Sequence, residues 1–284
     1  MPMAEHTWTD ELKDQVRALS GAALFGVPLL YTMEVWWVGA HTSAAQMALI
    51  LAGTFATVAA LTHVAGFRAQ KDVLLRDTVM DSVEAVAVGL LASLLILMVI
   101  REIEPGTPPR ELLGKVIYHG ITASIGVALA AQFFHGYADA GGDDDGGAPA
   151  GGALGTLIDL GASAIGATFV ISAIAPTDEV PMLAAASSPG WLLVVMAASL
   201  LISYAIVFVS GFSSEEKRRM QPGVLQHPVT ETVAAYVVAL VVCTVGLLTF
   251  QRIDLSDPYS VWLPQVLLLG LPGAIGGAAG RLAV

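Results

Sequence analysis

The sequence predicts an all-α, polytopic membrane protein with eight transmembrane helices arranged as two parallel four-helix repeats. The composition is the first observation behind this prediction: of 284 residues, 55% are hydrophobic and only 13% are charged, and the mean hydropathy is +0.72. A soluble domain carries about 25% charged residues. The composition therefore excludes an ordinary cytosolic enzyme, and the net charge of −11 disfavours a nucleic-acid partner. The single cysteine, Cys243, can form neither an internal disulfide nor a cysteine-rich zinc site.

Apolar runs are the second observation. A helix needs roughly 20 apolar residues to cross a bilayer, and no run alternates with the period of two that a membrane β-strand shows. A cytoplasmic amphipathic segment, residues 1–18, precedes the first run. The eight expected spans are 19–39, 45–66, 82–100, 112–135, 154–176, 190–212, 229–250 and 260–282.

The positive charges predict the orientation. With the N-terminus inside, nine of the 13 Lys and Arg residues lie in cytoplasmic segments and four in outer segments. Because Lys and Arg are enriched on the cytoplasmic side, both termini are expected in the cytoplasm. The composition is typical of bacteria, so we expect the cytoplasmic membrane, with the lipid bilayer as surroundings.

An internal repeat is the third observation. A shift of 145 residues, and of 150 further along, aligns acidic and glycine positions in the two halves. The matched pairs include Gly21 with Gly166, Glu34 with Glu179, Asp81 with Glu231, and Gly120 with Gly270. The repeats are expected at 19–135 and 153–284, joined by a Gly/Asp-rich linker, 136–152. Since each half has an even number of spans, both enter the membrane from the same side.

Two acidic segments occupy matched positions near the ends of the first and fifth spans. An ionisable group inside a span is costly and marks a functional site by default, and prolines break helices and free carbonyl groups that can coordinate cations. No intramembrane Lys or Arg lies near these segments in the sequence, which favours a cation over an anion. The candidate ion-binding or pathway residues are Thr32, Glu34, Thr177, Asp178 and Glu179, and the helix-breaking prolines are Pro28, Pro176 and Pro181.

A structural explanation of these segments stays open. Trp36 and Trp37 mark a membrane interface, where a glutamate can reach water. Thr177 and Asp178 are also residue types that cap the start of a helix.

A second acidic layer is expected at the cytoplasmic ends, where Asp81 and Glu231 open the third and seventh spans. They could gather cations, although the helix dipole alone explains acidic residues in a first turn. Glu84 aligns with Ala234 and so breaks the symmetry. It could act as a gate, as a proton site or as a partner of His119.

The last span carries a run of glycines, Gly270, Gly273, Gly276, Gly277 and Gly280. Small residues let helices approach closely, so these glycines predict packing within the fold or a homo-oligomer through this helix. We found no motif for nucleophilic catalysis, a zinc protease or a phosphate loop. The chain is therefore expected not to be an enzyme and to need no cofactor, and the sequence identifies no metal.

The segment 175–182, Ala-Pro-Thr-Asp-Glu-Val-Pro-Met, together with the span pattern, resembles a family of bacterial integral membrane proteins of unknown function. The resemblance covers nearly the whole chain and implies a polytopic inner-membrane protein without an assigned substrate. The residues predict a cation channel or a cation/proton-coupled transporter, with an inorganic cation or proton as its ligand. The alternative is a non-transporting scaffold or regulatory subunit that binds other membrane proteins.

Overall fold

The computed structural model describes residues 8–69, 75–139, 153–210 and 227–282, and these ranges form ten α-helices. The helices are α1 (Trp8–Leu30), α2 (Met33–His41), α3 (Ala44–Ala69), α4 (Leu75–Val99), α5 (Pro109–Asp139), α6 (Ala153–Ile174), α7 (Glu179–Ala186), α8 (Pro189–Phe208), α10 (Pro228–Thr249) and α11 (Tyr259–Leu282). α5 continues to Asp139, so it includes the first four residues of the expected linker 136–152. Its remaining residues, 140–152, lie outside the described ranges.

Seven of the described helices are long and apolar enough to cross a membrane, namely α3, α4, α5, α6, α8, α10 and α11. They confirm an all-helical, polytopic membrane protein. The expected first span, 19–39, is not a single helix, because α1 ends at Leu30 and α2 begins at Met33. The first three turns of α1 carry acidic and basic residues. α1 is therefore less apolar than the seven helices that are suited to cross a membrane.

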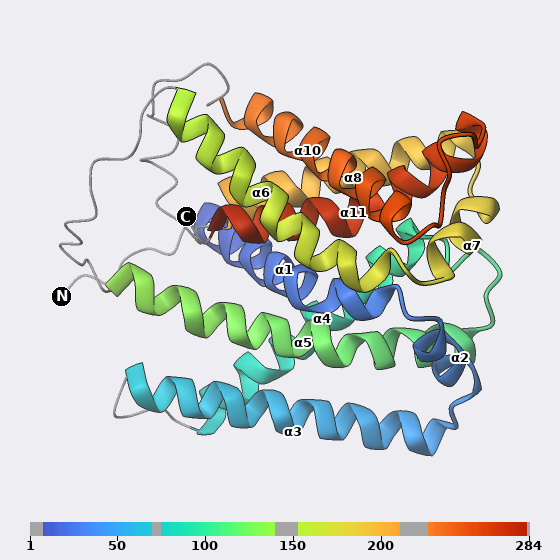
Figure 1. Ribbon diagram of the computed structural model, residues 1–284. Coiled ribbons are helices and arrows are strands. Elements are labelled where there is room, and N and C mark those ends of the chain that lie inside the picture. The colour runs from blue at the N-terminus through green and yellow to red at the C-terminus, as the bar shows by residue number, and fades with distance from the viewer. Residues whose placement is uncertain (1–7, 70–74, 140–152, 211–226, 283–284) are drawn as a thin grey trace.

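The long helices run between two ends of one bundle (Figure 1). The short helices α2 and α7 lie together at one end, which we call the break end. The start of α1 and the end of α11 lie at the opposite end, which we call the terminal end. The first and the last described helix therefore begin and end, respectively, at the same end of the bundle.

The helices pack as two groups. In the first group α5 packs against α1, α2, α3 and α4, and in the second α11 packs against α6, α7, α8 and α10. Between the groups the contacts are thinner and run mainly from α1 to α8 and α11. A buried apolar cluster nevertheless continues across this boundary, from Tyr31 and Leu97 to Leu247 and Leu268.

Glycines permit the closest helix crossing in each group. A Cβ atom at Gly126 of α5 would lie 2.5 Å from the carbonyl oxygen of Gly21 in α1, and a Cβ at Gly276 of α11 would lie 2.6 Å from that of Gly166 in α6. Such close approach is what small residues provide in membranes. The glycines of the last span thus pack against α6 and α10 of the same chain. The glycine face of α11 is therefore covered by other helices of the same chain and is not available for the homo-oligomer that the sequence suggested.

Two local motifs recur at the spacings of the sequence repeat. Arg101 and Gln251, 150 residues apart, each end a helix with a positive φ, of 65° and 56°. The residue after each of them donates its backbone N–H to the carbonyl of Leu97 or Leu247 respectively. Ser43 and Ser188, 145 residues apart, each accept a backbone N–H at the start of a long helix, from Gln46 and Trp191.

Candidate ion-pathway pocket

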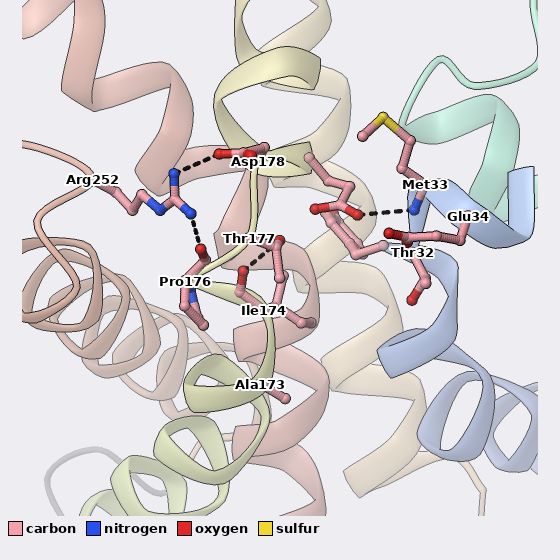
Figure 2. Close-up of a pocket in the computed structure, with 11 residues that line it drawn as sticks. Thr32, Met33, Glu34, Ala173, Ile174, Pro176, Thr177, Asp178 and Arg252 are labelled. Atoms are coloured by element: carbon pink, nitrogen blue, oxygen red, sulfur yellow. Dashed lines mark hydrogen bonds and ion pairs between the residues drawn. The ribbon is translucent and has the colours of Figure 1, made fainter. Parts of the chain in front are cut away.

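A pocket of about 300 Å³ lies at the break end, where the α1–α2 connection meets the α6–α7 connection (Figure 2). Its lining brings together all five residues that the sequence singled out as the outer candidates. It is lined by Tyr31, Thr32, Met33, Glu34, Ala173, Ile174, Pro176, Thr177, Asp178, Glu179 and Arg252. The pocket therefore joins segments almost 150 residues apart in the chain.

The interruption between α1 and α2 and the one between α6 and α7 both position polar groups, but their prolines occupy different places relative to the helix ends. Pro28 lies inside α1, two residues before its end, and Thr32 is extended, with φ −117° and ψ 105°. Pro176 lies between α6 and α7, where the Thr177 hydroxyl donates to the carbonyl of Ile174 at 2.7 Å. Pro181 does not break a helix, since it lies in the first turn of α7, where an N–H has no helical partner.

Glu179 links the two helix groups. Its side chain is buried, and its Oε1 accepts the backbone N–H of Met33, the first residue of α2, at 2.9 Å. The N-cap residue of α2, Thr32, makes no side-chain capping hydrogen bond. A carboxylate at a helix N-terminus satisfies a donor and interacts favourably with the helix dipole. Glu179 therefore caps a helix of the other group.

Glu34, the sequence counterpart of Glu179, is exposed and lines the same pocket. Its side chain extends from the start of α2 toward the α6–α7 side of the pocket (Figure 2). The two carboxylates thus share one water-accessible space but differ in burial and in hydrogen bonding.

Arg252, which follows α10, is a pocket residue that the sequence reasoning missed. It forms an ion pair with Asp178 at 2.6 Å and donates to the carbonyl of Pro176. The sequence reasoning considered only Lys and Arg residues inside the spans, so it did not place this outer-segment arginine beside the acidic segments. The pairing neutralises Asp178 and occupies a carbonyl that was expected to be free for a cation. The sequence did mark Arg252 in one way: at a shift of 150 it aligns with Glu102, so the second half has a base where the first half has an acid.

A family model described as "Putative integral membrane protein (DUF2391)" matches residues 14–284. The chain belongs to this family. The family predicted from segment 175–182, integral membrane proteins of unknown function, is thereby confirmed. No curated protein and no solved structure matches the chain.

At the terminal end of this DUF2391 protein, Glu231 is not a free carboxylate. It is buried and forms an ion pair with Arg281, whose side chain is wholly enclosed. The Arg281 guanidinium also lies 5.4 Å from the ring centroid of Phe208. Both charges of this pair lie inside the protein, so Glu231 does not present a free carboxylate at the entrance of an ion pathway.

Asp81 and Glu84 are exposed on α4. Glu84 accepts a hydrogen bond from the side-chain amide of Gln15 at 2.6 Å. The Nδ1 atom of His119 lies 2.8 Å from the carbonyl oxygen of Lys115. Glu84 and His119 each contact another residue, and neither Asp81 nor Glu84 lines the pocket.

The break end of the DUF2391 chain holds further charged contacts. Lys115 pairs with Glu102 and Glu111, each at 2.6 Å. Burial raises the pKa of Glu102, and the hydrogen bond from Lys115 opposes that rise. Hydrogen bonds from Ser256 lower the pKa of Asp254. Among the described residues no three or more His, Cys, Asp or Glu side chains gather in a way that could hold a metal ion.

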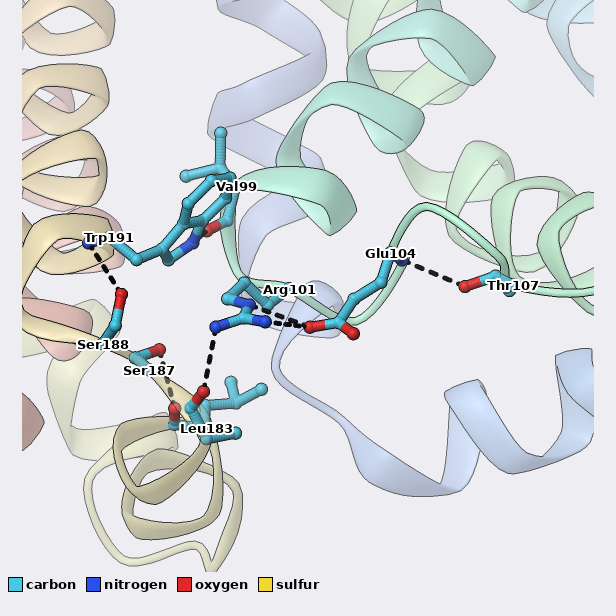
Figure 3. A network of polar contacts seen from close by, with 9 residues as sticks. Val99, Arg101, Glu104, Thr107, Leu183, Ser187, Ser188 and Trp191 are labelled. Atoms are coloured by element: carbon cyan, nitrogen blue, oxygen red, sulfur yellow. Dashed lines mark hydrogen bonds and ion pairs between the residues drawn. The ribbon is translucent and has the colours of Figure 1, made fainter.

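Arg101, which follows α4, connects the two groups through a network of polar contacts (Figure 3). It pairs with Glu104, donates to the carbonyl of Ala186 at 3.1 Å and lies 5.7 Å from the ring centroid of Trp191. The indole N–H of Trp191 donates to the carbonyl of Val99 at 2.7 Å. The break end is therefore held together by several polar contacts between the two groups.

Proposed function

We propose that this protein is a cation channel or a cation/proton-coupled transporter of the bacterial cytoplasmic membrane, and not an enzyme. Glu34 and Glu179 form its binding or selectivity pair. One observation carries the proposal: carboxylates from two separate helix groups line a single pocket. An acid at the end of one helix has many structural uses, whereas two matched acids that meet at one cavity favour a shared ligand.

The proposal includes two parallel four-span repeats, with α1 as the eighth span. The recurring helix ends at Arg101 and Gln251 support it, as do the glycine crossings of α1 with α5 and of α6 with α11. The start of α1 and the end of α11 lie at the same end of the bundle (Figure 1), in agreement with an even number of spans. The distribution of Lys and Arg assigns that end to the cytoplasm.

The charge of the pocket favours a cation. Three carboxylates, those of Glu34, Asp178 and Glu179, line the same pocket as one guanidinium, that of Arg252, so two negative charges remain when all four groups are ionised. Like charges in one cavity repel each other, and either a proton or a metal cation relieves the repulsion. A proton and a cation therefore compete for the pair, which is a physical basis for coupling.

At the cytoplasmic end, we propose that Asp81 and Glu84 gather cations through their field. Both are exposed on α4, whereas Glu231 forms a buried ion pair with Arg281. The exposed carboxylates of the second acidic layer thus lie on the first repeat.

Flux through proteoliposomes that contain only this protein tests the proposal. Gradients of H⁺, Na⁺, K⁺ and Ca²⁺ are applied to the unmodified chain and to the double variant Glu34→Gln, Glu179→Gln. We expect flux of at least one ion and its loss in the double variant. Asp254→Asn is the matched control, because Asp254 is an exposed carboxylate at the same end that does not line the pocket. Undiminished flux in a folded double variant contradicts the assignment.

The second candidate is a scaffold or regulatory subunit. The capping of α2 by Glu179 favours it, because that contact explains a buried carboxylate without a transported ion. This candidate requires no flux for any ion and stable co-purification with another membrane protein.

A further inference from the structure

Arg252 belongs to two cavities at the break end. It lines the pocket described above, and it also lines a second cavity of about 480 Å³ that is formed by residues 248–257 of the α10–α11 connection. We call this second space the loop cavity. Arg252 is the lining residue that the pocket and the loop cavity share. It therefore lies at the boundary between them.

The backbone of Arg252 is fixed by the end of α10, and its side chain is positioned by contacts at its tip. Gln251 ends the helix with a φ of 56°, and the Arg252 N–H donates to the carbonyl of Leu247 at 2.8 Å. The guanidinium forms an ion pair with Asp178 at 2.6 Å and donates to the carbonyl of Pro176 (Figure 2). The α6–α7 connection therefore decides where this positive charge lies.

The two acceptors of the guanidinium are also ligand types for a metal cation. In proteins Ca²⁺ binds carboxylate and backbone carbonyl oxygens, with about six to eight oxygens per ion. Asp178 supplies the carboxylate and Pro176 supplies the carbonyl, and Arg252 binds both. A charge that is fixed to the chain thus occupies groups that a free cation could bind.

Carboxylates line both cavities. Glu34 and Glu179 line the pocket, and Asp254 and Asp257 line the loop cavity. Of the described residues that line the two cavities, Arg252 alone carries a positive charge. A cation that moves between the cavities therefore passes a fixed positive charge, which raises the energy of the ion in proportion to the ion's own charge.

We propose that Arg252 determines the valence selectivity of the pocket: it excludes divalent cations, so that Glu34 and Glu179 bind a proton or a monovalent cation. The inference deepens the proposed function and rests on it. Charge alone does not exclude a divalent cation, because two negative charges remain in the pocket. The shortage of oxygen ligands does, since Arg252 binds two potential ligands and the Met33 N–H binds one oxygen of Glu179. A proton needs only one carboxylate oxygen, and a monovalent cation meets half the repulsion that a divalent one meets.

Calcium binding to the purified protein in nanodiscs of zwitterionic lipid, measured by isothermal titration calorimetry, tests the proposal. Arg252→Gln removes the positive charge and releases Asp178 and the Pro176 carbonyl. We expect this variant to bind Ca²⁺ roughly tenfold or more tightly than the unmodified chain. Addition of Asp178→Asn should return the affinity to the unmodified level, because one of the released ligands is lost. Arg252→Lys keeps the charge and should show no gain.

Arg110→Gln is the matched control. Arg110 is exposed, donates to the carbonyl of Thr42 at the same end of the bundle, and lines neither cavity. Its replacement changes the net charge by the same amount as Arg252→Gln, so it should leave the Ca²⁺ affinity unchanged. An equal gain in both variants would contradict the proposal, because net charge rather than the place of Arg252 would then explain the gain.

Three further results overturn the proposal. One is an Arg252→Gln variant that is folded, by thermal unfolding, and gains no Ca²⁺ affinity. Another is a gain that persists after addition of Asp178→Asn. The third needs no change at Arg252: it is Ca²⁺ that binds to the unmodified chain but not to the double variant Glu34→Gln, Glu179→Gln, because such an ion occupies the pocket while the arginine is present.

Failure of this inference and failure of the proposed function are distinguishable. Ca²⁺ flux through the unmodified protein that the double variant Glu34→Gln, Glu179→Gln loses would overturn the valence selectivity and support the proposed function. Absence of flux for every ion would contradict the proposed function. The calcium titrations, which require no flux, would still decide whether Arg252 excludes Ca²⁺ from the pocket.

Discussion

Glu179 and Met33 join the two halves of the chain at one point, where a buried carboxylate of α7 accepts the first backbone N–H of α2 at 2.9 Å. The same residue lines the pocket that also holds Glu34. A single side chain thus completes a helix and contributes charge to a cavity. These two roles can be separated by substitution.

Glu179→Gln and Glu179→Ala are expected to affect stability differently. The amide oxygen of glutamine still accepts the Met33 N–H, whereas alanine leaves that donor without its partner. Loss of a cap costs about 0.5–2 kcal/mol, so the alanine variant should lower the free energy of unfolding by that amount and the glutamine variant by less. Unfolding in detergent measures both, and equal losses would contradict the capping role.

Glu231 and Arg281 form a buried pair, and removal of one partner leaves the other charge enclosed. We expect Glu231→Ala to destabilise the protein by about 3–5 kcal/mol. The double variant Glu231→Leu, Arg281→Met should recover most of that loss, because it encloses no charge. Denaturant unfolding of the single and double variants measures the difference, and a double variant no better than the single one would refute this explanation.

Gly276 tests the glycine crossing of α6 with α11. A Cβ at this position would lie 2.6 Å from the carbonyl oxygen of Gly166, so Gly276→Ala must push the helices apart. Overpacking of this kind costs about 1–3 kcal/mol. Gly161→Ala on α6 is the control, since a Cβ there meets nothing within 4 Å, and it should be neutral or stabilising. Thermal unfolding compares the stabilities of the two variants. A Gly161→Ala variant less stable than the Gly276→Ala variant would contradict the close crossing of α6 and α11.

Gln251 and Arg101 share a left-handed backbone but not their surroundings. Glycine adopts this conformation without a steric cost, so Gln251→Gly should raise the free energy of unfolding by roughly 0.5–1 kcal/mol. Arg101→Gly should give no such gain, because it removes the contacts with Glu104, the Ala186 carbonyl and Trp191 (Figure 3). Parallel unfolding measurements test the contrast, and a gain in both variants would show that the Arg101 contacts add nothing.

The sequence by itself determined that the chain is helical and membrane-embedded, with seven spans close to their predicted positions. It also indicated the family, which residues 14–284 match. These properties are predictable because the length and apolar character of a span are local, and because backbone buried in lipid must satisfy its hydrogen bonds internally, which a helix does within one segment. Acidic residues could be singled out for a similar reason, since a charge inside an apolar run is conspicuous in the sequence alone.

The tertiary structure decided which of these groups meet. It ended α1 at Leu30, inside the expected span 19–39, brought Arg252 to Asp178 and enclosed Glu231 with Arg281. It also packed the glycines of α11 against α6 and α10 of the same chain. Apolar side chains of α3 and α6, such as Leu49 and Phe169, stayed exposed. An ion pair or a helix crossing depends on which segments become neighbours, and neighbours distant in the chain are chosen by the packing of the whole bundle. Hydropathy records the preference of each segment for lipid but carries no information about its partner.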